Sequence, residues 1–489
     1  MTTNHFHPPA LHASRPPRCP PFVTVDRPAD LLPYFDAVAR RPYNPGLWPA
    51  WDLQKDERVL LRVTNWHDPW VIEAAEETLR RFGTRYEIQH EDKGPIPKWQ
   101  GHDEVDYYLA RTKELMRWMD EWEEWDAAGR YDKVLMGYGG PVLAERKIKI
   151  QRMPFITREM VASPAHVYPH ELLTAIDRWT WERVTKARRV HLTDPEGTDI
   201  WFTNHDAYYD SDRRYYADEW VRRSYPQNVA YGRTYLPGHV WGRPSFHIPQ
   251  EDGHGVIAGT MNHIAPFPRV EMTVDKSRIV AIDGGGEFGD KLRELKAKTD
   301  PLSYPGYAQP GMLQWWEASI GTNPKIHRPR DGYPEGYNCG LYERMRSGIV
   351  HIGFGTVISS DFERQAERLG LPVGHFHVHL NFPTYHAEMV DGSEELIIDA
   401  GRLKALDDPA IRALAARFGD PDELLAEDWV PAIPGLNMTG DYMRDYAADP
   451  MDWTVTELHV CRRYHPLFMK MIAPETDGDM ASACAHSGH

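Results

Sequence analysis

Residues 58–89 carry the pattern that most constrains the fold. Arg58–Thr64 is a short, mostly apolar run that is typical of a buried strand. A helix start at Asp68-Pro69 leads into Val71–Phe82, where apolar residues recur at helical spacing, and Arg85–Gln89 begins a second strand. A strand, a helix and a strand joined by short connections predict a βαβ unit and therefore a parallel sheet.

The pattern changes after Thr193. Before it, a long helix at 103–130 and a strand at Lys133–Met136 continue the alternation of helix and strand. After it, short strands dominate up to about residue 400, as in the hairpin at Val270–Ile282. We predict an α/β fold with three parts: an extended Pro- and His-rich arm at 1–33, an open α/β domain with parallel strands at 34–195, and a β-rich α+β domain at 196–489 that ends in a helical tail.

Trp118, Trp122 and Trp125 share one face of the long helix, because they lie four and three residues apart. Such a stripe favours core packing, with a ligand platform as the alternative.

Charge and composition exclude several classes of protein. The chain has 56 Lys and Arg against 72 Asp and Glu, a net charge of −16, which argues against nucleic acid or an anionic membrane surface as the main partner. No apolar run reaches the roughly 18 residues that span a bilayer, and the start lacks the pattern of a secretory signal. Four scattered cysteines suggest neither a disulfide framework nor a thiolate metal site. We expect a cytoplasmic protein.

The densest group of chemically active side chains lies at Gly374–His386. His375, His377 and His379 alternate along a predicted strand, so they point to one face. Burying several imidazoles without a metal or an acid is costly. The pattern therefore indicates a metal site, with a surface or hydrogen-bonded histidine cluster as the alternative.

Other candidates are single residues. His351 lies in an apolar strand and is either a satisfied core histidine or a ligand. Glu317 follows two tryptophans, and an apolar pocket would raise its pKa unless a cation such as a metal compensates. His239, His247 and His263 are either loop histidines or members of a site. Zincin, phosphate-loop and nucleophile-elbow motifs are absent from the sequence.

The order of short motifs resembles the aminopeptidase T-like family (leucyl aminopeptidase, thermophilic metallo-aminopeptidase). The resemblance covers about residues 55 to 400, and its motifs are Asp194–Asp199, Leu236-Pro-Gly, the Val270–Ile282 hairpin, Trp316–Asn323, Val350–Gly355 and the His-rich strand that ends at Asp391-Gly392. Six motifs in this order make a moderately specific match. The last 60 or so residues lie outside the resemblance.

The resemblance implies a set of metal ligands. Glu317 and His351 match a metal-binding glutamate and histidine, and His379, or His377 after a one-step shift, matches the histidine of the last motif. The family's further carboxylates are missing, since Asn381 replaces an aspartate and His239 follows Leu-Pro-Gly. Fewer acids and more imidazoles suit one softer metal better than a bridged pair.

Among relatives, the ligand pattern is closest to a 2,5-dihydroxypyridine 5,6-dioxygenase-like branch. That similarity implies a mononuclear non-haem Fe(II) dioxygenase that cleaves the ring of a small hydroxylated aromatic or heteroaromatic with O2, with His386 or His239 as an acid/base group. The alternative is a metal-dependent aminopeptidase or amidohydrolase with zinc or cobalt, and a non-catalytic metal- or partner-binding protein is a third class. The family resemblance also implies a homodimer.

Overall fold

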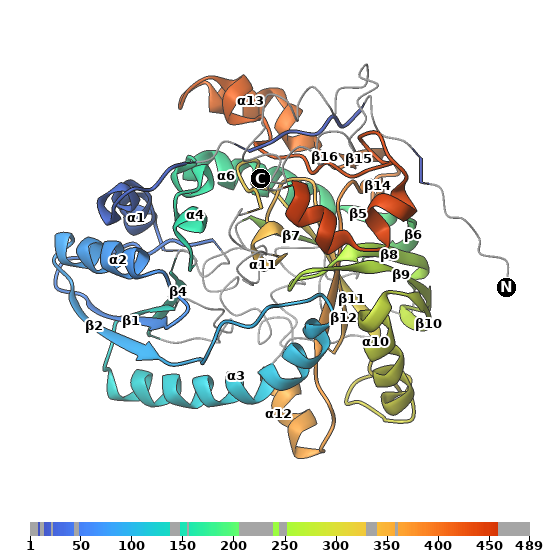
Figure 1. Cartoon of the computed structure of the whole chain (residues 1–489), viewed down its shortest axis with the longest axis horizontal. Coiled ribbons are helices and arrows are strands. Elements are labelled where there is room, and N and C mark those ends of the chain that lie inside the picture. The colour runs from blue at the N-terminus through green and yellow to red at the C-terminus, as the bar shows by residue number, and fades with distance from the viewer. Residues whose placement is uncertain are drawn as a thin grey trace, which may run out of the picture.

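The computed structural model describes residues 8–9, 14–20, 23–43, 48–136, 147–153, 156–204, 238–243, 252–328, 340–356 and 360–457. Two sheets organise this part of the chain (Figure 1). One is a small parallel sheet and the other a large, mainly antiparallel sheet, with helices around both, which confirms the predicted α/β class.

The small sheet has the strand order β2-β1-β3-β4. Its strands are β1 Arg58–Thr64, β2 Arg85–Glu91, β3 Lys133–Met136 and β4 Lys149–Arg152. β1 pairs in parallel with β2, as the βαβ prediction requires, and α2 (Pro69–Arg81) connects them. Asp68 begins α2, because its side chain accepts a hydrogen bond from the Trp70 N–H. Alternate residues of β1 face opposite layers: Val59 packs with α2, whereas Leu60 packs with Trp122 of α3 (Asp103–Ala128).

The large sheet has twelve strands. Their order is β13-β12-β11-β10-β9-β8-β6-β5-β14-β15-β16, and β7 pairs with β11. Their bounds are β5 Ala187–Asp194, β6 Thr198–Thr203, β7 His239–Arg243, β8 His254–Met261, β9 Pro266–Asp275, β10 Arg278–Gly284, β11 Gln314–Gly321, β12 Val350–Gly355, β13 His375–Leu380, β14 Thr384–Met389, β15 Glu394–Asp399 and β16 Arg402–Leu403. The sheet curls so that β8 lies against β13, where Gly259 leaves room for Val378.

β5 belongs to this large sheet, because it pairs with β6 and β14. The sequence pattern assigns this strand to the first domain, whose predicted limit at residue 195 falls inside the β5–β6 hairpin. The structure therefore pairs β5 with strands that lie beyond this limit. The physical reason is that β5 finds its partners through contacts distant in sequence, which local pattern does not reveal.

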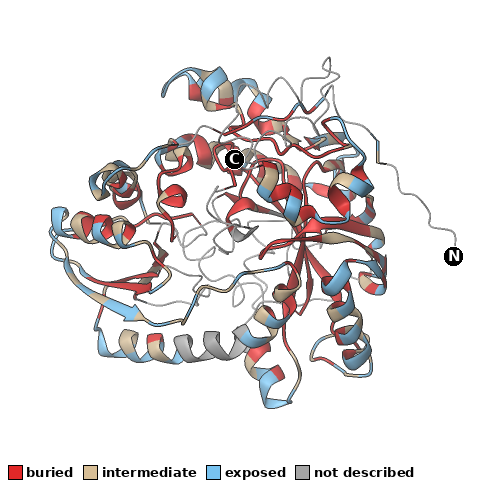
Figure 2. Cartoon of the chain, viewed as in Figure 1, coloured by how far each residue is buried: buried red, intermediate tan, exposed pale blue. Residues whose placement is uncertain are grey.

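Helices pack against both sheets, and the helix faces that point away from the sheets are exposed (Figure 2). The remaining ones are η1 Pro28–Leu31, α1 Leu32–Arg40, α4 Arg158–Val161, α5 Pro164–Val167, α6 His170–Val184, α10 Gly286–Thr299, α11 Gly340–Glu343, α12 Ser360–Arg368, η3 Lys404–Asp407, α13 Pro409–Ala415, α14 Pro421–Leu424 and the π-helix η4 Met443–Ala447. Among the described residues, no helix is both long and apolar enough to cross a membrane.

α3 joins the two sheets (Figure 1). Its 26 residues correspond to a length of about 39 Å. Near its start, Val105 and Tyr108 pack in the core of the large sheet, and near its end Trp122 is fully buried against the small sheet. Trp122 and Trp125 thus take part in core packing, as predicted for the tryptophan stripe, while the side chain of Trp118 lies outside the described residues.

The described part of the N-terminal arm packs against the C-terminal segment. Arg15 forms a buried ion pair with Glu427 at 2.8 Å, and Arg18 forms a β-bridge with Val430. Cys19 is buried in the same region and is disulfide-bonded.

The turn after β5 buries two carboxylates. Asp194 accepts backbone hydrogen bonds from Glu196 and Phe382, both at 2.9 Å. Glu196 accepts hydrogen bonds from the hydroxyls of Thr260 and Tyr442, which link β8 to the C-terminal segment. Burial, with the negative charge of Glu196, raises the pKa of Asp194 to about 8.

We predict that the raised pKa of Asp194 makes folding stability decrease as pH rises from 3.8 towards about 8. The ordinary pKa of an aspartic acid in an unfolded chain is 3.8, whereas folded Asp194 keeps its proton up to about pH 8. The contribution of protonated Asp194 to the free energy of unfolding is therefore complete below pH 3.8. It is lost as pH rises towards 8, with a limiting slope of about 1.4 kcal/mol per pH unit. Urea unfolding at pH 5 and at pH 8 measures it. Asp194→Asn should flatten the dependence, and the exposed Asp283→Asn should leave it unchanged.

Candidate metal centre

Four strands of the large sheet place polar side chains on one buried face. In the pairing register, Glu317 on β11 lies opposite Gly353 on β12, which lies opposite His377 on β13. In the next row, His351 on β12 lies opposite His379 on β13. β7 pairs with the other edge of β11 and brings His239 opposite Gly321. Because side chains two residues apart share a face, the register gathers one carboxylate and several imidazoles.

Glu317, His375 and His377 form one possible metal-binding group. His375 Nε2 lies 3.0 Å from Glu317 Oε2. The other ring nitrogen, His375 Nδ1, lies 2.8 Å from the Thr356 carbonyl oxygen, and His377 Nδ1 lies 2.9 Å from Glu104 Oε1. If each Nδ1 carries the proton and donates it to these acceptors, each Nε2 is left with a lone pair for a metal.

His239, His351 and Glu317 form a second group around the other carboxylate oxygen. His351 Nε2 lies 3.3 Å from Glu317 Oε1 and 3.2 Å from His239 Nε2. The Ser319 hydroxyl donates to the same Oε1 at 2.6 Å. In both groups all ligand atoms lie within 4.8 Å of one another. One ion bonded at about 2.0–2.2 Å to each atom spans such separations with small adjustments.

Gly353 lets the ligand atoms of the first group lie close to the backbone of β12. A Cβ added there would lie 2.3 Å from His375 Nε2 and 2.9 Å from Glu317 Oε2. A side chain at this position would therefore collide with two candidate ligand atoms and displace them. The donor atoms of this group fit a bound ion, and glycine at position 353 lets them keep their places.

Glu104, in the first turn of α3, also contacts this site. It accepts backbone hydrogen bonds from His377 at 3.3 Å and from His263 at 3.4 Å, besides its contact with His377 Nδ1. Glu104, His263 and His377 are a third group with metal-binding spacing. The His263 ring stacks on His377 with centroids 3.4 Å apart, and its Nδ1 lies 3.0 Å from the Tyr108 hydroxyl.

Burial and the neighbouring charges perturb the pKa values of the cluster. Burial would raise the pKa of Glu317, but hydrogen bonds and charge interactions with His239, His351 and His375 outweigh it and hold the pKa well below its usual range. Burial raises the pKa of Glu104 well above its usual range, although the two backbone N–H groups oppose the shift.

The histidines shift in the other direction. Burial lowers the pKa of His351 to about 3. Burial likewise lowers the pKa of His239, His263, His377 and His379, and the nearby positive charge of Arg344 adds to each shift. Neutral imidazoles are the form that binds metals. The environment thus favours the ligand form of these side chains at neutral pH.

The structure brings together most of the candidates from the sequence. Glu317, His351 and His377 contribute to the metal-binding groups, and His239 lies among the ligand atoms. His379 is fully buried beside them, with its ring 5.9 Å from that of His351, but among the described residues it belongs to no metal-binding group and neither ring nitrogen has a hydrogen-bond partner.

His386, which the resemblance suggested as an acid/base group, is not part of the cluster. It lies on β14, opposite His191 and Leu396 in the strand pairing. Its side chain is 42% exposed, and its Nε2 lies 3.6 Å from Glu394 on β15. The reason is that β14 leaves β13 through a turn and pairs with β5 and β15 instead. His247 lies outside the described residues.

Sequence reasoning missed two members of these groups as ligands or ligand partners. His375 alternates with His377 and His379, so the same period-two signal placed it on the correct face, but the family motif drew attention to the other two. Glu104 carries no local signal: it is one of several acids at the start of a helix that is rich in acidic residues.

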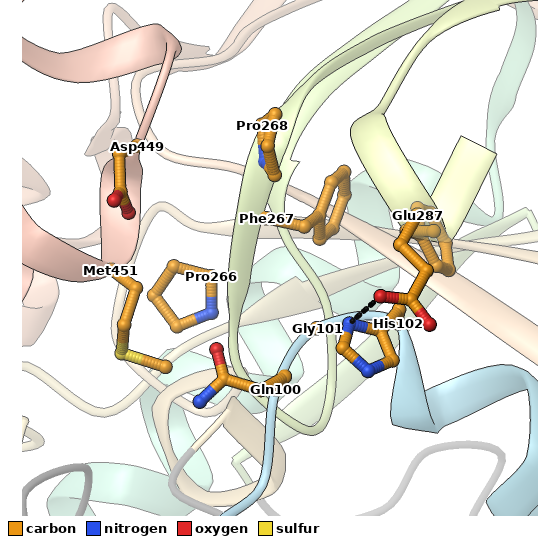
Figure 3. Close-up of a pocket in the computed structure, with 10 residues that line it drawn as sticks. Gln100, Gly101, His102, Pro266, Phe267, Pro268, Glu287, Asp449 and Met451 are labelled. Carbon is orange, nitrogen blue, oxygen red and sulfur yellow. Dashed lines mark ion pairs between the residues drawn. The ribbon is translucent and has the colours of Figure 1, made fainter. Parts of the chain in front are cut away.

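A pocket of about 200 Å³ lies outside the start of α3 (Figure 3). Pro266, Phe267, Phe288 and Met451 form much of its wall, and an ion pair joins His102 Nδ1 to Glu287 across its edge at 3.5 Å. None of the residues in the three metal-binding groups lines it. This pocket is therefore distinct from the candidate metal centre.

Comparison with known proteins gives few matches. No family model and no curated protein matches the chain. Among solved structures, 2,5-dihydroxypyridine dioxygenase from Pseudomonas putida KT2440 is similar, with 15% identity, a TM-score of 0.42, and coverage of 78% of this chain and 98% of that chain. AmpT from Thermus thermophilus is similar with 14% identity, a TM-score of 0.42, and coverage of 77% and 99%. At these values the similarity carries no argument about function.

We predict that Gly353→Ala lowers the affinity for a divalent ion such as Co²⁺ by at least about tenfold, by analogy with other disturbances next to metal ligands. The added methyl group would occupy the space beside His375 Nε2 and Glu317 Oε2. Equilibrium dialysis measures the affinity. Gly419→Ala is the matched control, since its Cβ would meet nothing closer than Leu424 at 3.5 Å. Equal affinity of the Gly353→Ala variant and the wild type would show that no ion binds beside Gly353.

Proposed function

We propose that this chain is a mononuclear non-haem iron(II) dioxygenase that opens the ring of a small hydroxylated aromatic or heteroaromatic substrate of the pyridine-diol type. The observation that carries the proposal is the group formed by Glu317, His375 and His377 beside Gly353. Two histidines and one carboxylate with open positions are the facial set that non-haem iron(II) oxygenases use. The reaction and the substrate class come from the resemblance of the sequence motifs.

The first group suits a metal better than the second. His375 and His377 each have an acceptor for Nδ1–H, namely Thr356 O and Glu104. Metal-binding histidines usually have such a partner, which sets the tautomer and the ring orientation. His351 Nδ1 is buried without a hydrogen-bond partner among the described residues. The geometry therefore supports His375 and His377 as the imidazole ligands.

The second group then holds the carboxylate ligand in place. Ser319 and His351 contact Glu317 Oε1, which leaves Oε2 turned towards His375. Bound iron(II) would supply the oxygen chemistry that amino-acid side chains lack. His239 remains a candidate acid/base group, because its Nε2 lies 3.5 Å from Glu317 Oε1 and therefore next to the ligand atoms.

One observation favours a second candidate, a metal-dependent aminopeptidase or amidohydrolase. The two oxygens of Glu317 face different histidine groups: Oε1 faces His239 and His351, and Oε2 faces His375. A carboxylate placed in this way can bridge two ions, as in two-metal hydrolases. The two candidates therefore differ in the number of metal ions per chain.

We predict one iron per chain in protein purified without oxygen, and O2 uptake when a hydroxylated pyridine or benzene is added. Elemental analysis and an oxygen electrode measure the two quantities. Glu317→Ala, His375→Ala and His377→Ala should lose bound iron and O2 uptake, since each removes a ligand. His386→Ala is the control, because this exposed histidine lies away from the cluster and both quantities should stay unchanged.

Two zinc or cobalt ions per chain, together with release of N-terminal residues from peptides, would support the hydrolase and contradict the dioxygenase. Protein that takes up no metal, and whose thermal stability does not change in His375→Ala, would contradict both and indicate a non-catalytic binding protein.

A further inference from the structure

We propose that Glu104 is a positioning residue for the metal centre: it orients His377 and thereby raises the metal affinity of a site that is otherwise built on the large sheet. The inference rests on the proposed role of His377 as a ligand. Glu104 belongs to α3, the helix that joins the two sheets. The amount of metal bound at the site would therefore depend on how α3 packs against the large sheet.

The contacts of Glu104 define both the place and the tautomer of His377. Its Oε2 accepts the His377 backbone N–H at 3.3 Å, and its Oε1 lies 2.9 Å from Nδ1 of the same residue. One carboxylate therefore holds the backbone and the ring of His377 together. Acceptance of Nδ1–H leaves the lone pair of Nε2 free for a metal, and His377 forms one possible metal-binding group with Glu317 and His375.

The contacts of Glu104 with His263 add a second restraint. Oε1 also accepts the His263 backbone N–H at 3.4 Å, and the His263 ring stacks against His377. The ring of His377 is thus confined by the carboxylate at its Nδ1 and by an imidazole on its face. Glu104 also connects β13 with the segment that follows β8, two parts of the curled sheet that lie against each other.

The charge of Glu104 fits this role. The side chain is fully buried, and its Oε1 lies 2.9 Å from His377 Nδ1. Burial without a nearby cation favours the neutral carboxyl group, so the ionised form of Glu104 needs a compensating charge nearby. A divalent ion on His377 Nε2 would supply that charge through the imidazole, as in the carboxylate–histidine–metal arrangement.

The restraint that Glu104 places on His377 would be lost if α3 moved. Val105 and Tyr108 hold the start of α3 in the core of the large sheet, and Trp122 holds its end against the small sheet. Glu104 lies next to Val105 and is therefore placed by this packing. The ligand His377 belongs to one sheet, and its orienting carboxylate comes from a helix anchored to both.

The test compares Co²⁺ binding by the full-length apoprotein in four forms: wild type, Glu104→Gln, Glu104→Asp and Glu196→Gln. Glutamine replaces the ionisable carboxyl group by an amide of nearly the same size, and aspartate keeps the carboxyl group but withdraws it by one methylene. Glu196 is the matched control, because it is equally buried and accepts three side-chain hydrogen bonds, from Thr260, Tyr442 and Asn381.

We expect both Glu104 variants to bind Co²⁺ about 10–100-fold more weakly than the wild type in equilibrium dialysis, as for other outer-shell carboxylates. The visible absorption of bound Co²⁺ should change as well, since the orientation of one ligand changes, and the rise in melting temperature on Co²⁺ addition should be smaller. Glu196→Gln should lower stability but leave the Co²⁺ affinity unchanged. Circular dichroism confirms that each variant is folded.

Three results would overturn the inference: no binding of Co²⁺ by the wild type, wild-type affinity in both Glu104 variants, or an equal loss in Glu196→Gln, which would indicate general loosening of the sheet. The outcome is separate from that of the proposed function. Weaker Co²⁺ binding in the Glu104 variants supports the inference even if the iron-loaded wild type consumes no O2.

Discussion

The buried carboxylate of Glu317 is the interaction on which the rest of the site depends. It lies between two histidine groups, with Oε1 towards His239 and His351 and Oε2 towards His375. Burying an ionised carboxylate is costly unless donors or cations surround it. Here the imidazoles and the Ser319 hydroxyl provide that surrounding. The same neighbours hold the pKa of Glu317 well below its usual range even though burial opposes this. Glu317 is thus an anion around which a metal site can form.

The sheet register makes this arrangement possible. Antiparallel pairing of β11, β12 and β13 sets Glu317, Gly353 and His377 in one row across three strands. A side chain in the middle of that row would collide with His375 and Glu317, and glycine avoids the collision. A shift of one residue in either pairing would turn the imidazoles to the opposite, apolar face, where Phe376 and Val378 lie in the core. Core packing on one face therefore holds the chemistry on the other.

α3 gives the fold its second organising contact. A parallel sheet and a curled antiparallel sheet share this helix, which packs into both cores. Glu104 extends that connection into the site, because it touches β13 and the segment after β8. The small sheet is thus connected to the candidate metal centre through α3, without supplying a strand to it.

Sequence patterns predicted local elements well. The strand bounds at 58–64 and 133–136 agree with the structure, as does the start of the long helix at residue 103, because each depends on the periodicity of neighbouring residues. The pairing of β5 with β6 and β14, and the place of His386 away from the histidine cluster, could not be predicted in this way, because strand pairing and chain reversal depend on distant contacts.

By itself the sequence determined that His375, His377 and His379 share one face of a strand, because side-chain direction alternates with every residue of an extended chain. It also determined that an acid and a histidine, Glu317 and His351, lie on apolar segments suited to burial. Only the tertiary structure decided which ring nitrogens meet which oxygens. Glu104 and His377 are 273 residues apart in the chain and 2.9 Å apart in space. No local period relates such residues, since their approach results from the packing of α3 against the curled sheet.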